Sequence, residues 1–498
     1  MTTPTLPGPL ARYEDVIEDW PAFVSATTSQ EPTTFRVRRA LLSASDLASR
    51  LREQGFETSQ VSGLTDYLRV VGGPGSVAQT LEHWLGFLHV QQAVMALPPL
   101  ALAPRPGERI LDLCAAPGGK TTHLSELMNE RGALLAVDPK EKRLRGLMAN
   151  VFRLGYTNVI TIAADGRELP DAALFDRVLV DAPCSAEGNL RRQGGKGGKH
   201  PADFRRYVSR LQESLLRKAI QLTRPGGVVV YSTCTFAPEE NEAVVHRVLA
   251  DSPVEIEPIP LDLPHSPGLS AWEGLDFAPA ITQTWRVYPH HLDSGGLFMA
   301  RLRRKEGETP TGDGPRPDWE PIPPGFPGEA DRAARERIEG ARAVLEEEYG
   351  FVSQVLEGLS WIVRKENIWV HTAGEWPYPG WQDRGGWRVV SAGLRAFRAA
   401  RGGKETPSNQ FLSRFQRAMG GERRLDLDAA SLQELLDDRP LPAGDRPAGP
   451  LALFFRDTLI GRGMVGRSGL RHEIPAAQAA RLRAILRQPS HPRDEERT

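Results

Sequence analysis

Two cysteines stand beside polar residues at the ends of apolar runs. Cys184 occurs in Asp181-Ala-Pro-Cys-Ser, and Cys234 occurs in Tyr231-Ser-Thr-Cys-Thr-Phe. Since both runs are typical of strands in a parallel sheet, the two thiols are expected to converge at the carboxyl edge, where such sheets bind ligands. A lone cysteine is often only a buried packing residue, but the polar flanks favour a reactive site here. A zinc site is disfavoured, because the sequence has no C-x-x-C motif and no paired histidines at ligand spacing.

A glycine-rich loop follows an earlier apolar run. Residues 109–114 (Arg-Ile-Leu-Asp-Leu-Cys) lead into Ala115-Ala-Pro-Gly-Gly-Lys-Thr-Thr, after which a helix is expected. Backbone N–H groups at such a strand-to-helix turn suit an anionic or nucleoside ligand, and Gly118 and Gly119 permit close approach of the backbone. The loop is neither a Walker A motif nor a G-x-G-x-x-G motif, so a nicotinamide cofactor is not favoured.

Three aspartates, Asp138, Asp165 and Asp181, end the strands that are expected after this loop. Asp138 stands about 20 residues after Gly118, where a carboxylate can accept hydrogen bonds from ribose hydroxyls. The alternative for each aspartate alone is that it only caps a helix or a turn. Their shared position at one sheet edge with the glycine loop favours a ligand site.

Apolar runs alternate with amphipathic helices between about residues 109 and 304, which predicts a mostly parallel sheet with helices on both faces. The expected strands are 109–114, 133–138, 159–164, 177–181, 227–234 and a last strand from Gly296. The expected helices are 121–129, 141–154 and 204–222.

The two cysteine segments and residues 111–122 (Leu-Asp-Leu-Cys-Ala-Ala-Pro-Gly-Gly-Lys-Thr-Thr) occur in an order that resembles a known family. This family is the RNA cytosine-C5 methyltransferases related to Sun proteins, and the likeness is to its bacterial RsmF branch. It covers about Trp84 to Arg304. Two departures are visible: Ala186 stands where the family usually has glycine, and Val90-Gln-Gln-Ala replaces a Gln-Glu pairing.

The resemblance implies a covalent mechanism with Cys234 as the nucleophile. Cytosine C5 is a poor nucleophile, so a thiolate adds at C6 before C5 attacks the sulfonium methyl of S-adenosylmethionine. By the same resemblance, Cys184 assists when the C5 proton leaves and the enzyme–base bond breaks. Asp181 is expected to hydrogen-bond the polar edge of the base, and Lys120 to position the base or lower the thiol pKa.

The resemblance also implies a Rossmann-like class I fold with a mostly parallel seven-stranded sheet, and S-adenosylmethionine as the cofactor. Asp138 is expected at its ribose, Asp165 near its adenine and Asp181 close to it, and no metal is expected. The residues expected around its methionine moiety are Cys114, Ala115, Ala116, Pro117, Gly118, Gly119 and Lys120.

Basic residues are frequent after Cys184, and Gly194-Gly195 and Gly197-Gly198 are interleaved with them. They are interpreted as a phosphate-binding loop, with a solvated charged face as the alternative. These residues are Arg191, Arg192, Lys196, Lys199, His200, Arg205, Arg206 and Arg210.

Composition shifts and the resemblance divide the chain into five parts. They are an RNA-recognition-like α+β module over 1–83, the catalytic domain over 84–304, a Pro- and Gly-rich linker over 305–330, an intermediate domain over 331–436 and a PUA-like RNA-binding domain over 437–498. The last assignment rests on Leu451-Ala-Leu-Phe-Phe-Arg-Asp, Gly461-Arg-Gly-Met-Val, Arg456, Arg462, Arg467 and Arg471. Core packing is favoured over base stacking for Trp361, Trp369, Trp376, Trp381 and Trp387.

The chain has 498 residues, of which 40% are hydrophobic and 25% are charged, and its formal net charge is -1. Wholesale disorder, a fibre and a small disulfide scaffold are therefore disfavoured. Three cysteines suggest a reducing, cytoplasmic location, and neither a signal peptide nor a membrane span is expected.

The hypothesis is a monomeric, S-adenosylmethionine-dependent enzyme that forms 5-methylcytosine in RNA. Its expected partner is ribosomal RNA or the small ribosomal subunit, with 16S ribosomal RNA as the substrate and transfer RNA as the alternative. A non-catalytic RNA-binding ribosome assembly factor is another possibility, although it would be expected to lose Cys234 or the glycine loop. A DNA or protein methyltransferase is a third, for which the paired cysteines are poorly suited.

Overall fold

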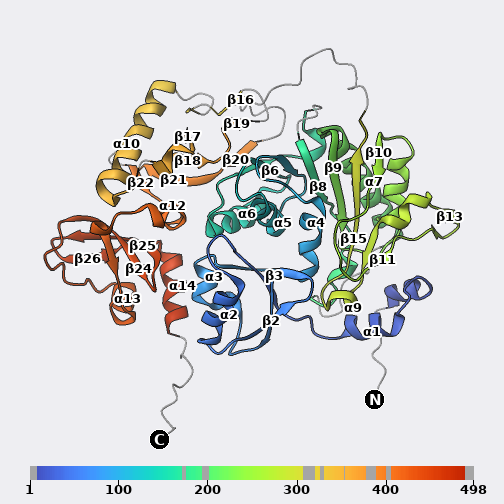
Figure 1. The fold of residues 1–498 in the computed structure, drawn as a ribbon, viewed down its shortest axis with the longest axis horizontal. Helices are drawn as coiled ribbons and strands as arrows, with labels where there is room; N and C mark the ends of the chain where they lie inside the picture. Colours follow the sequence, from blue (N-terminus) through green and yellow to red (C-terminus); the bar gives the residue numbers. More distant parts are fainter. Residues whose placement is uncertain are drawn as a thin grey trace, which may run out of the picture.

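The computed structural model describes residues 8–170, 175–192, 201–306, 320–322, 324–325, 330–352, 354–376, 388–399 and 405–487. A ten-stranded sheet lies at the centre of the molecule, and smaller sheets from the two ends of the chain lie beside it (Figure 1). Within these ranges, no helix combines the length and the apolar character that a membrane crossing requires.

The central sheet has a parallel core. In spatial order its main strands are β11 (Ser266–Pro267), β14 (Trp285–Val287), β15 (Leu297–Arg304), β9 (Thr223–Thr233), β8 (Phe175–Asp181), β5 (Arg109–Asp112), β6 (Ala133–Asp138), β7 (Val159–Ala163) and β20 (Arg388–Ala392). The five strands from β9 to β7 pair in parallel, whereas β15, β14 and β20 pair antiparallel with their neighbours. β10 (Val254–Ile256) pairs with β15. The strands from β14 to β7 confirm the expected Rossmann-like, mostly parallel seven-stranded sheet.

Helices cover both faces of this sheet, because alternate strand residues point into two separate cores. Leu111 and Val178 pack into the core under α7 (Ala202–Leu222) and α8 (Glu242–Leu249). Ile110 and Leu179 pack into the core on the other face. The helices there are α4 (Leu97–Leu102), α5 (Gly119–Leu127) and α6 (Glu141–Leu154). The three predicted helices are thus present, and α6 has the predicted bounds.

The N-terminal part forms a four-stranded antiparallel sheet in the order β2-β3-β1-β4. Its elements are β1 (Thr34–Val37), α2 (Ala44–Arg52), β2 (Glu57–Val61), β3 (Leu64–Gly72), η2 (Val77–Gln79), α3 (Leu81–Trp84) and β4 (Leu88–Val90). Phe35 of β1 lies opposite Val90 of β4. The sheet therefore continues past the boundary expected at residue 83.

The first residues do not belong to that sheet. η1 (Gly8–Val16) and α1 (Trp20–Thr28) place Leu10, Tyr13 and Phe23 in a core with Phe236 and Tyr288 of the catalytic region. Figure 1 shows α1 beside α9 (Pro289–Leu292). The module expected over 1–83 is therefore divided, because residues 8–28 bury their apolar side chains elsewhere.

Short elements connect the strands of the catalytic region. They are η3 (Ala93–Ala96), η4 (Gly166–Glu168), η5 (Glu187–Asn189), β12 (Ala271–Trp272), β13 (Leu275–Asp276) and η6 (Pro279–Gln283).

The C-terminal part contains two further four-stranded sheets. The first has the order β17-β18-β21-β22 and the second β23-β24-β25-β26. The elements of the first region are β16 (Glu320–Pro321), α10 (Asp331–Tyr349), α11 (Gln354–Glu357), β17 (Ser360–Arg364), β18 (Asn367–His371), β19 (Glu375–Trp376), β21 (Leu394–Ala399), β22 (Glu405–Pro407), α12 (Asn409–Arg414) and η8 (Gln416–Ala418). Those of the second are η9 (Gly421–Arg423), β23 (Arg424–Asp426), α13 (Ala429–Leu436), β24 (Gly449–Phe455), β25 (Thr458–Gly466), β26 (Gly469–His472) and α14 (Ala476–Leu486).

The boundary expected at residue 436 divides the last sheet, because β23 pairs in parallel with β24. Trp361, Trp369 and Trp376 are buried, so core packing is their role, as expected. Trp381 and Trp387 lie outside the described residues.

The three regions meet at a single buried carboxylate. Glu130 Oε1 lies 2.6 Å from Nη2 of Arg38 and 3.3 Å from Nη2 of Arg414. The Thr372 hydroxyl donates a hydrogen bond to the backbone carbonyl of Glu130 at 2.7 Å. Glu130 thus ties the N-terminal sheet, the central sheet and the C-terminal part together.

Candidate active site at the carboxyl edge of the central sheet

The predicted site residues gather at one edge, because the parallel strands all end there. Asp181 ends β8, and Cys184 follows it after a short turn. Cys234 comes directly after β9, and Lys120 lies in the first turn of α5. The register places Asp181 opposite Ser232, so the ends of β8 and β9 lie side by side.

The two thiols are in contact. Sγ of Cys184 lies 3.3 Å from Sγ of Cys234, and Asn189 Nδ2 donates a hydrogen bond to Cys234 Sγ, also at 3.3 Å. The hydrogen bond from Cys184 lowers the pKa of Cys234, while the same contact together with burial raises the pKa of Cys184. Cys234 is therefore the thiol that ionises first, with Cys184 as its hydrogen-bond donor.

An ion pair stands beside the thiols. Lys120 Nζ lies 2.7 Å from Oδ2 of Asp181, and the Ser232 hydroxyl donates to Oδ1 at 3.0 Å. The Lys120 side chain is 9% exposed and that of Asp181 is 31% exposed, so the carboxylate is the partner that a ligand can reach. The charge of Asp181 raises the pKa of Cys234, and the charge of Lys120 opposes this effect in part.

Buried polar side chains hold the segment that carries Cys184. Glu240 Oε2 accepts hydrogen bonds from the backbone N–H of Ser185 at 2.9 Å and from Gln212 at 3.0 Å. Glu187 Oε2 accepts one from the Thr235 hydroxyl at 3.0 Å, which links this segment to the one after Cys234. These bonds fix the distance between the two thiols.

The departure at Ala186 falls on a left-handed backbone position. Its φ is 59°, a conformation that glycine adopts without cost and that a Cβ strains. Gly188, two residues on, touches the backbone of Gly296, where a Cβ would lie 2.4 Å from the carbonyl oxygen. The loop therefore tolerates the alanine but has no room for a side chain at Gly188.

The glycine loop turns from β5 into α5 as expected. Gly118 has a φ of 96° and caps the helix, so α5 begins at Gly119, two residues before the predicted start. The Arg143 guanidinium donates to the Ala116 carbonyl at 2.5 Å, and the Asn150 amide donates to the Pro117 carbonyl at 3.1 Å. Side chains of α6 thus fix the outer side of the loop.

Asp138 has an oxygen that a ligand could use. Its Oδ1 accepts a hydrogen bond from the Lys140 backbone N–H at 2.9 Å. Its Oδ2 is buried and lacks a hydrogen-bond partner among the described residues, although Arg143 Nη1 lies 3.0 Å away as an ion pair. A ribose hydroxyl would satisfy this oxygen, so the residue fits the nucleoside end of a cofactor.

Asp165 is placed differently from the other aspartates. Its carboxylate caps η4 by accepting a hydrogen bond from the Arg167 backbone N–H at 3.0 Å, and it accepts further bonds from the Arg167 guanidinium at 2.6 to 3.2 Å. The hydrogen bonds from Arg167 lower the pKa of this carboxyl. The contacts of Asp165 are therefore those of a helix cap, although the residue lies at the same sheet edge as Asp138 and Asp181.

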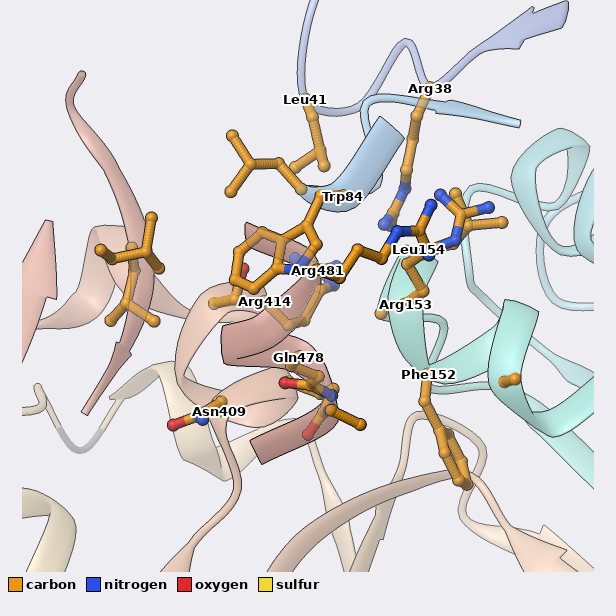
Figure 2. A pocket seen from close by; sticks show the side chains of 18 residues that line it. Arg38, Leu41, Trp84, Phe152, Arg153, Leu154, Asn409, Arg414, Gln478 and Arg481 are labelled. Carbon is orange, nitrogen blue, oxygen red and sulfur yellow. The ribbon is translucent and has the colours of Figure 1, made fainter. Parts of the chain in front are cut away.

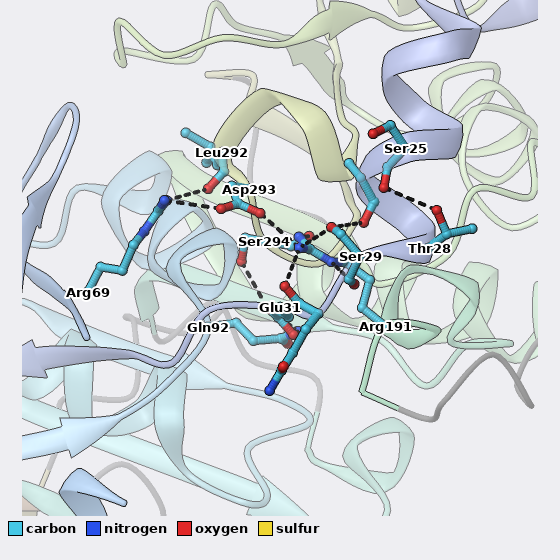
Figure 3. A network of polar contacts seen from close by, with 12 residues as sticks. Ser25, Thr28, Ser29, Glu31, Arg69, Gln92, Arg191, Leu292, Asp293 and Ser294 are labelled. Carbon is cyan, nitrogen blue, oxygen red and sulfur yellow. Dashed lines mark hydrogen bonds and ion pairs between the residues drawn. The ribbon is translucent and has the colours of Figure 1, made fainter. Parts of the chain in front are cut away.

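The expected phosphate-binding loop needs correction in its described part. The Arg191 side chain is buried and donates to Asp293 at 2.8 Å, to the Ser29 hydroxyl at 3.0 Å and to the Ser294 carbonyl at 3.1 Å (Figure 3). Arg192 pairs with Glu31. Arg191 therefore ties α1 to the segment after α9 and is not free to bind phosphate.

The remaining basic residues of this segment divide into three groups. Arg205 and Arg206 form ion pairs with Glu239 and Asp203. Arg210 is exposed on α7. Lys196, Lys199 and His200 lie outside the described residues, so the phosphate-binding role stays a prediction for them.

The sequence did not predict that Asn189 and Ser232 contact the site residues. The two differ in whether a sequence pattern could have indicated this. Ser232 could have been found, since strand alternation places it on the same side as Cys234. Asn189 stands in an irregular segment with no periodicity, so only the folded loop brings it to the thiol. In the part of the chain that the structure describes, no cluster of metal-ligating side chains is present.

We expect Asn189→Ala to move the acidic limb of the pH profile of Cys234 alkylation upward by about one unit, because a hydrogen bond to the thiolate is lost. Mass spectrometry of the Cys234 peptide after iodoacetamide treatment measures this. The profile of the unchanged protein, measured under the same conditions, is the reference. An unchanged profile would show that Asn189 does not stabilise the thiolate.

The buried carboxyl of Asp112 should make stability depend on pH. Burial raises its pKa to about 7, and its Oδ1 has no hydrogen-bond partner among the described residues. Because this folded-state pKa exceeds the usual value of 3.8, protonation of Asp112 stabilises the folded state. This stabilisation is fully present below about pH 4 and is lost as the pH rises through about 7.

The difference in the free energy of unfolding between Asp112→Asn and the unchanged chain is therefore expected to shift in favour of the variant. The shift should be roughly 2–4 kcal/mol as the pH rises from about 5 to about 8. Urea denaturation at both pH values measures the difference. Parallel pH profiles for the two proteins would contradict it.

Known proteins are similar to this chain in the region that carries the site. The chain matches the family of 16S rRNA methyltransferase RsmB/F over residues 99–303. It is 37% identical over 227 residues to a tRNA (cytosine(49)-C(5))-methyltransferase of Pyrococcus abyssi, covering 45% of this chain and 73% of that protein. It is 35% identical over 257 residues to a ribosomal RNA small subunit methyltransferase F of Erwinia tasmaniensis, covering 50% of this chain and 51% of that protein.

Eukaryotic relatives, named as rRNA (cytosine-C(5))-methyltransferases, are 34 to 36% identical to this chain, which spans 36 to 49% of their length. A solved structure, a methyltransferase homolog protein from Pyrococcus horikoshii, is 34% identical with a TM-score of 0.53, covering 59% of this chain and 93% of that chain. The family match spans the glycine loop and both cysteine segments.

Proposed function

The chain belongs to the family of RNA (cytosine-C5) methyltransferases, and from this premise we propose that it methylates C5 of a cytosine in RNA. We propose S-adenosylmethionine as the methyl donor and a covalent bond between Cys234 and C6 of the base as the intermediate. The observation that carries the proposal is the pair of thiols 3.3 Å apart, beside the ion pair of Lys120 and Asp181.

Cys234 is the proposed nucleophile. Its Sγ accepts hydrogen bonds from Cys184 and Asn189, and both favour the thiolate. The thiolate forms a bond to C6, and the electron pair of the C5–C6 double bond becomes available at C5. When bound, S-adenosylmethionine supplies the methyl group that passes from its sulfonium sulfur to C5.

Cys184 is proposed to act in the second half of the reaction. Once Cys234 is bonded to C6, its sulfur is no longer a charged hydrogen-bond acceptor, so the largest cause of the raised pKa of Cys184 disappears. Cys184 can then lose its proton to water and accept the proton from C5. The C5–C6 double bond forms again as the S–C6 bond breaks, which returns Cys234 to the thiolate.

Asp181 and Lys120 are proposed to orient the base. The partly exposed carboxylate of Asp181 can accept a hydrogen bond from the exocyclic amino group of cytosine. Lys120 holds that carboxylate in place at 2.7 Å. A base fixed in this way has its C6 against the thiol, which is the positioning that bond formation requires.

The proposed cofactor contacts follow the sheet edge. The loop from Cys114 to Lys120 would hold the methionine moiety, and Asp138 the ribose, where its buried Oδ2 supports the assignment. Asp165 is proposed near the adenine, a role in which Arg167 would have to share its carboxylate.

The proposed substrate is 16S ribosomal RNA or the small ribosomal subunit, with transfer RNA as the alternative, because relatives of both kinds match the chain. The target base must leave its stack to reach the thiol. The N-terminal sheet and the β23–β26 sheet are the proposed RNA-recognition-like and PUA-like regions, and Arg467 and Arg471 are exposed on the latter. We propose a monomer that acts in the cytoplasm.

The test is methyl transfer from labelled S-adenosylmethionine to small ribosomal subunits, naked 16S ribosomal RNA and transfer RNA, followed by mapping of 5-methylcytosine. Labelled 5-methylcytosine in one of them would identify the substrate. RNA binding without transfer to any RNA would favour the assembly-factor alternative.

A further inference from the structure

A cavity of about 450 Å³ lies where the three regions meet, and none of the proposed catalytic or cofactor residues lines it (Figure 2). The N-terminal part contributes Arg38 and Trp84, and the end of α6 contributes Arg153. The C-terminal part contributes residues of α12, β25 and α14, among them Arg414 and Arg481. Its volume is that of a site for a small ligand.

The lining is strongly positive. It includes four arginines, Arg38, Arg153, Arg414 and Arg481, and no aspartate or glutamate from the described residues. Glu130 compensates two of them, since Arg38 and Arg414 share its carboxylate. The other two arginines have no ion-pair partner in the part of the chain that the structure describes.

Arg153 and Arg481 instead bond to backbone carbonyls and to the rings of two histidines, His83 and His89. Arg153 Nη1 donates to the His83 carbonyl at 2.8 Å, and Arg481 Nη2 lies 2.9 Å from His83 Nδ1. Burial and the two arginines lower the pKa of His83 to about 3, so this ring is neutral. Burial and the nearby Arg481 also lower the pKa of Arg153 to about 10. An anion in the cavity would relieve this repulsion.

An aromatic face stands beside these cations. Trp84 follows His83 on α3 and is partly exposed, and it has no ring partner among the described residues. Trp84, Arg481 and Phe152 all line the cavity (Figure 2). Such a face accepts a stacked base of any identity. Gln478 and Asn409 add amide groups that can hydrogen-bond a base edge.

We propose that this cavity binds a nucleotide, with its phosphate between Arg153 and Arg481 and its base on Trp84. The ligand is either a free mononucleotide or a nucleotide of the RNA substrate that stands outside a duplex. The second source rests on the proposed function, and the first does not. In that second case the cavity anchors the RNA at a point distinct from the target cytosine.

The test compares Arg481→Gln and Trp84→Leu with Arg332→Gln, a control that removes an equal charge from an exposed position on α10. Calorimetry with each ribonucleoside 5′-monophosphate and with inorganic phosphate measures free ligands. Filter binding measures the affinity for the RNA that the protein methylates, or for 16S ribosomal RNA if no transfer is found. Thermal unfolding confirms that each variant is folded, and Arg481 is exposed enough for its loss to spare the fold.

A mononucleotide site is expected to lose about tenfold in affinity in both cavity variants and to be unchanged in the control. An RNA anchor is expected to show the same loss for RNA only. Binding of inorganic phosphate as tight as that of the nucleotides and insensitive to Trp84→Leu would overturn the proposal, and so would unchanged affinities throughout. Absence of methyl transfer by the unchanged protein, with mononucleotide binding intact, would contradict the proposed function alone.

Discussion

Cys234→Ala is expected to reduce methyl transfer to RNA by roughly 10⁴-fold or more, because the S–C6 bond that activates C5 cannot form. Binding of S-adenosylmethionine should be unchanged, since Cys234 follows β9 while the proposed cofactor loop follows β5. Single-turnover transfer from labelled S-adenosylmethionine measures the rate, and calorimetry measures cofactor binding.

Cys234→Ser is the matched control, since it keeps the size and a hydrogen bond while replacing the thiol by a much weaker nucleophile. It should be as inactive as the alanine variant. Appreciable transfer by either protein would show that Cys234 does not form the bond, and would shift the proposal to Cys184 as nucleophile.

Cys184→Ala is expected to accumulate a covalent protein–RNA adduct and to slow turnover by roughly 10²- to 10⁴-fold. Cys234 can still attack C6, but the group that removes the C5 proton is missing, so the S–C6 bond persists. Denaturing gel electrophoresis with labelled RNA detects the adduct as a protein band of reduced mobility.

The double variant Cys184→Ala, Cys234→Ala is the control, because it lacks the attacking thiol and should give no adduct. The adduct should also depend on S-adenosylmethionine, since the trapped species follows methyl transfer. Normal turnover by Cys184→Ala without any adduct would contradict the role assigned to this thiol.

The central sheet and its site edge could be predicted because local pattern and burial agree there. All six residues of β6 are buried, and this continuous apolar run is what a strand covered on both faces requires. α6 ends at Leu154 and is capped by Gly155 in the left-handed conformation, a stop that the glycine signals in the sequence. Once these elements alternate, the carboxyl ends of β5 to β9 must meet, and the motifs that follow them meet as well.

Contacts between distant segments could not be read in the same way. β20 carries only a short apolar pattern, and nothing in it indicates that β7, more than 200 residues earlier, is its partner. Arg191 stands in a basic stretch, yet residues from α1 and from the turn after α9 surround it in the folded chain. Asp165 shares its sheet edge with the other aspartates but turns its carboxylate to Arg167. These contacts depend on which segments lie close together in the folded chain, and local sequence patterns do not reveal that.

The antiparallel pairing of β20 with β7 has a consequence for any attempt to isolate the catalytic region. A chain cut near residue 304 would leave the outer edge of β7 without a partner strand, while its other edge stays paired with β6. An open, apolar strand edge is a template for aggregation. Residues 388–392 act as a built-in cover for that strand, although they come from the C-terminal part. We therefore expect the smallest unit that stays in solution to include this strand, which comes late in the chain, rather than to end where the catalytic motifs end.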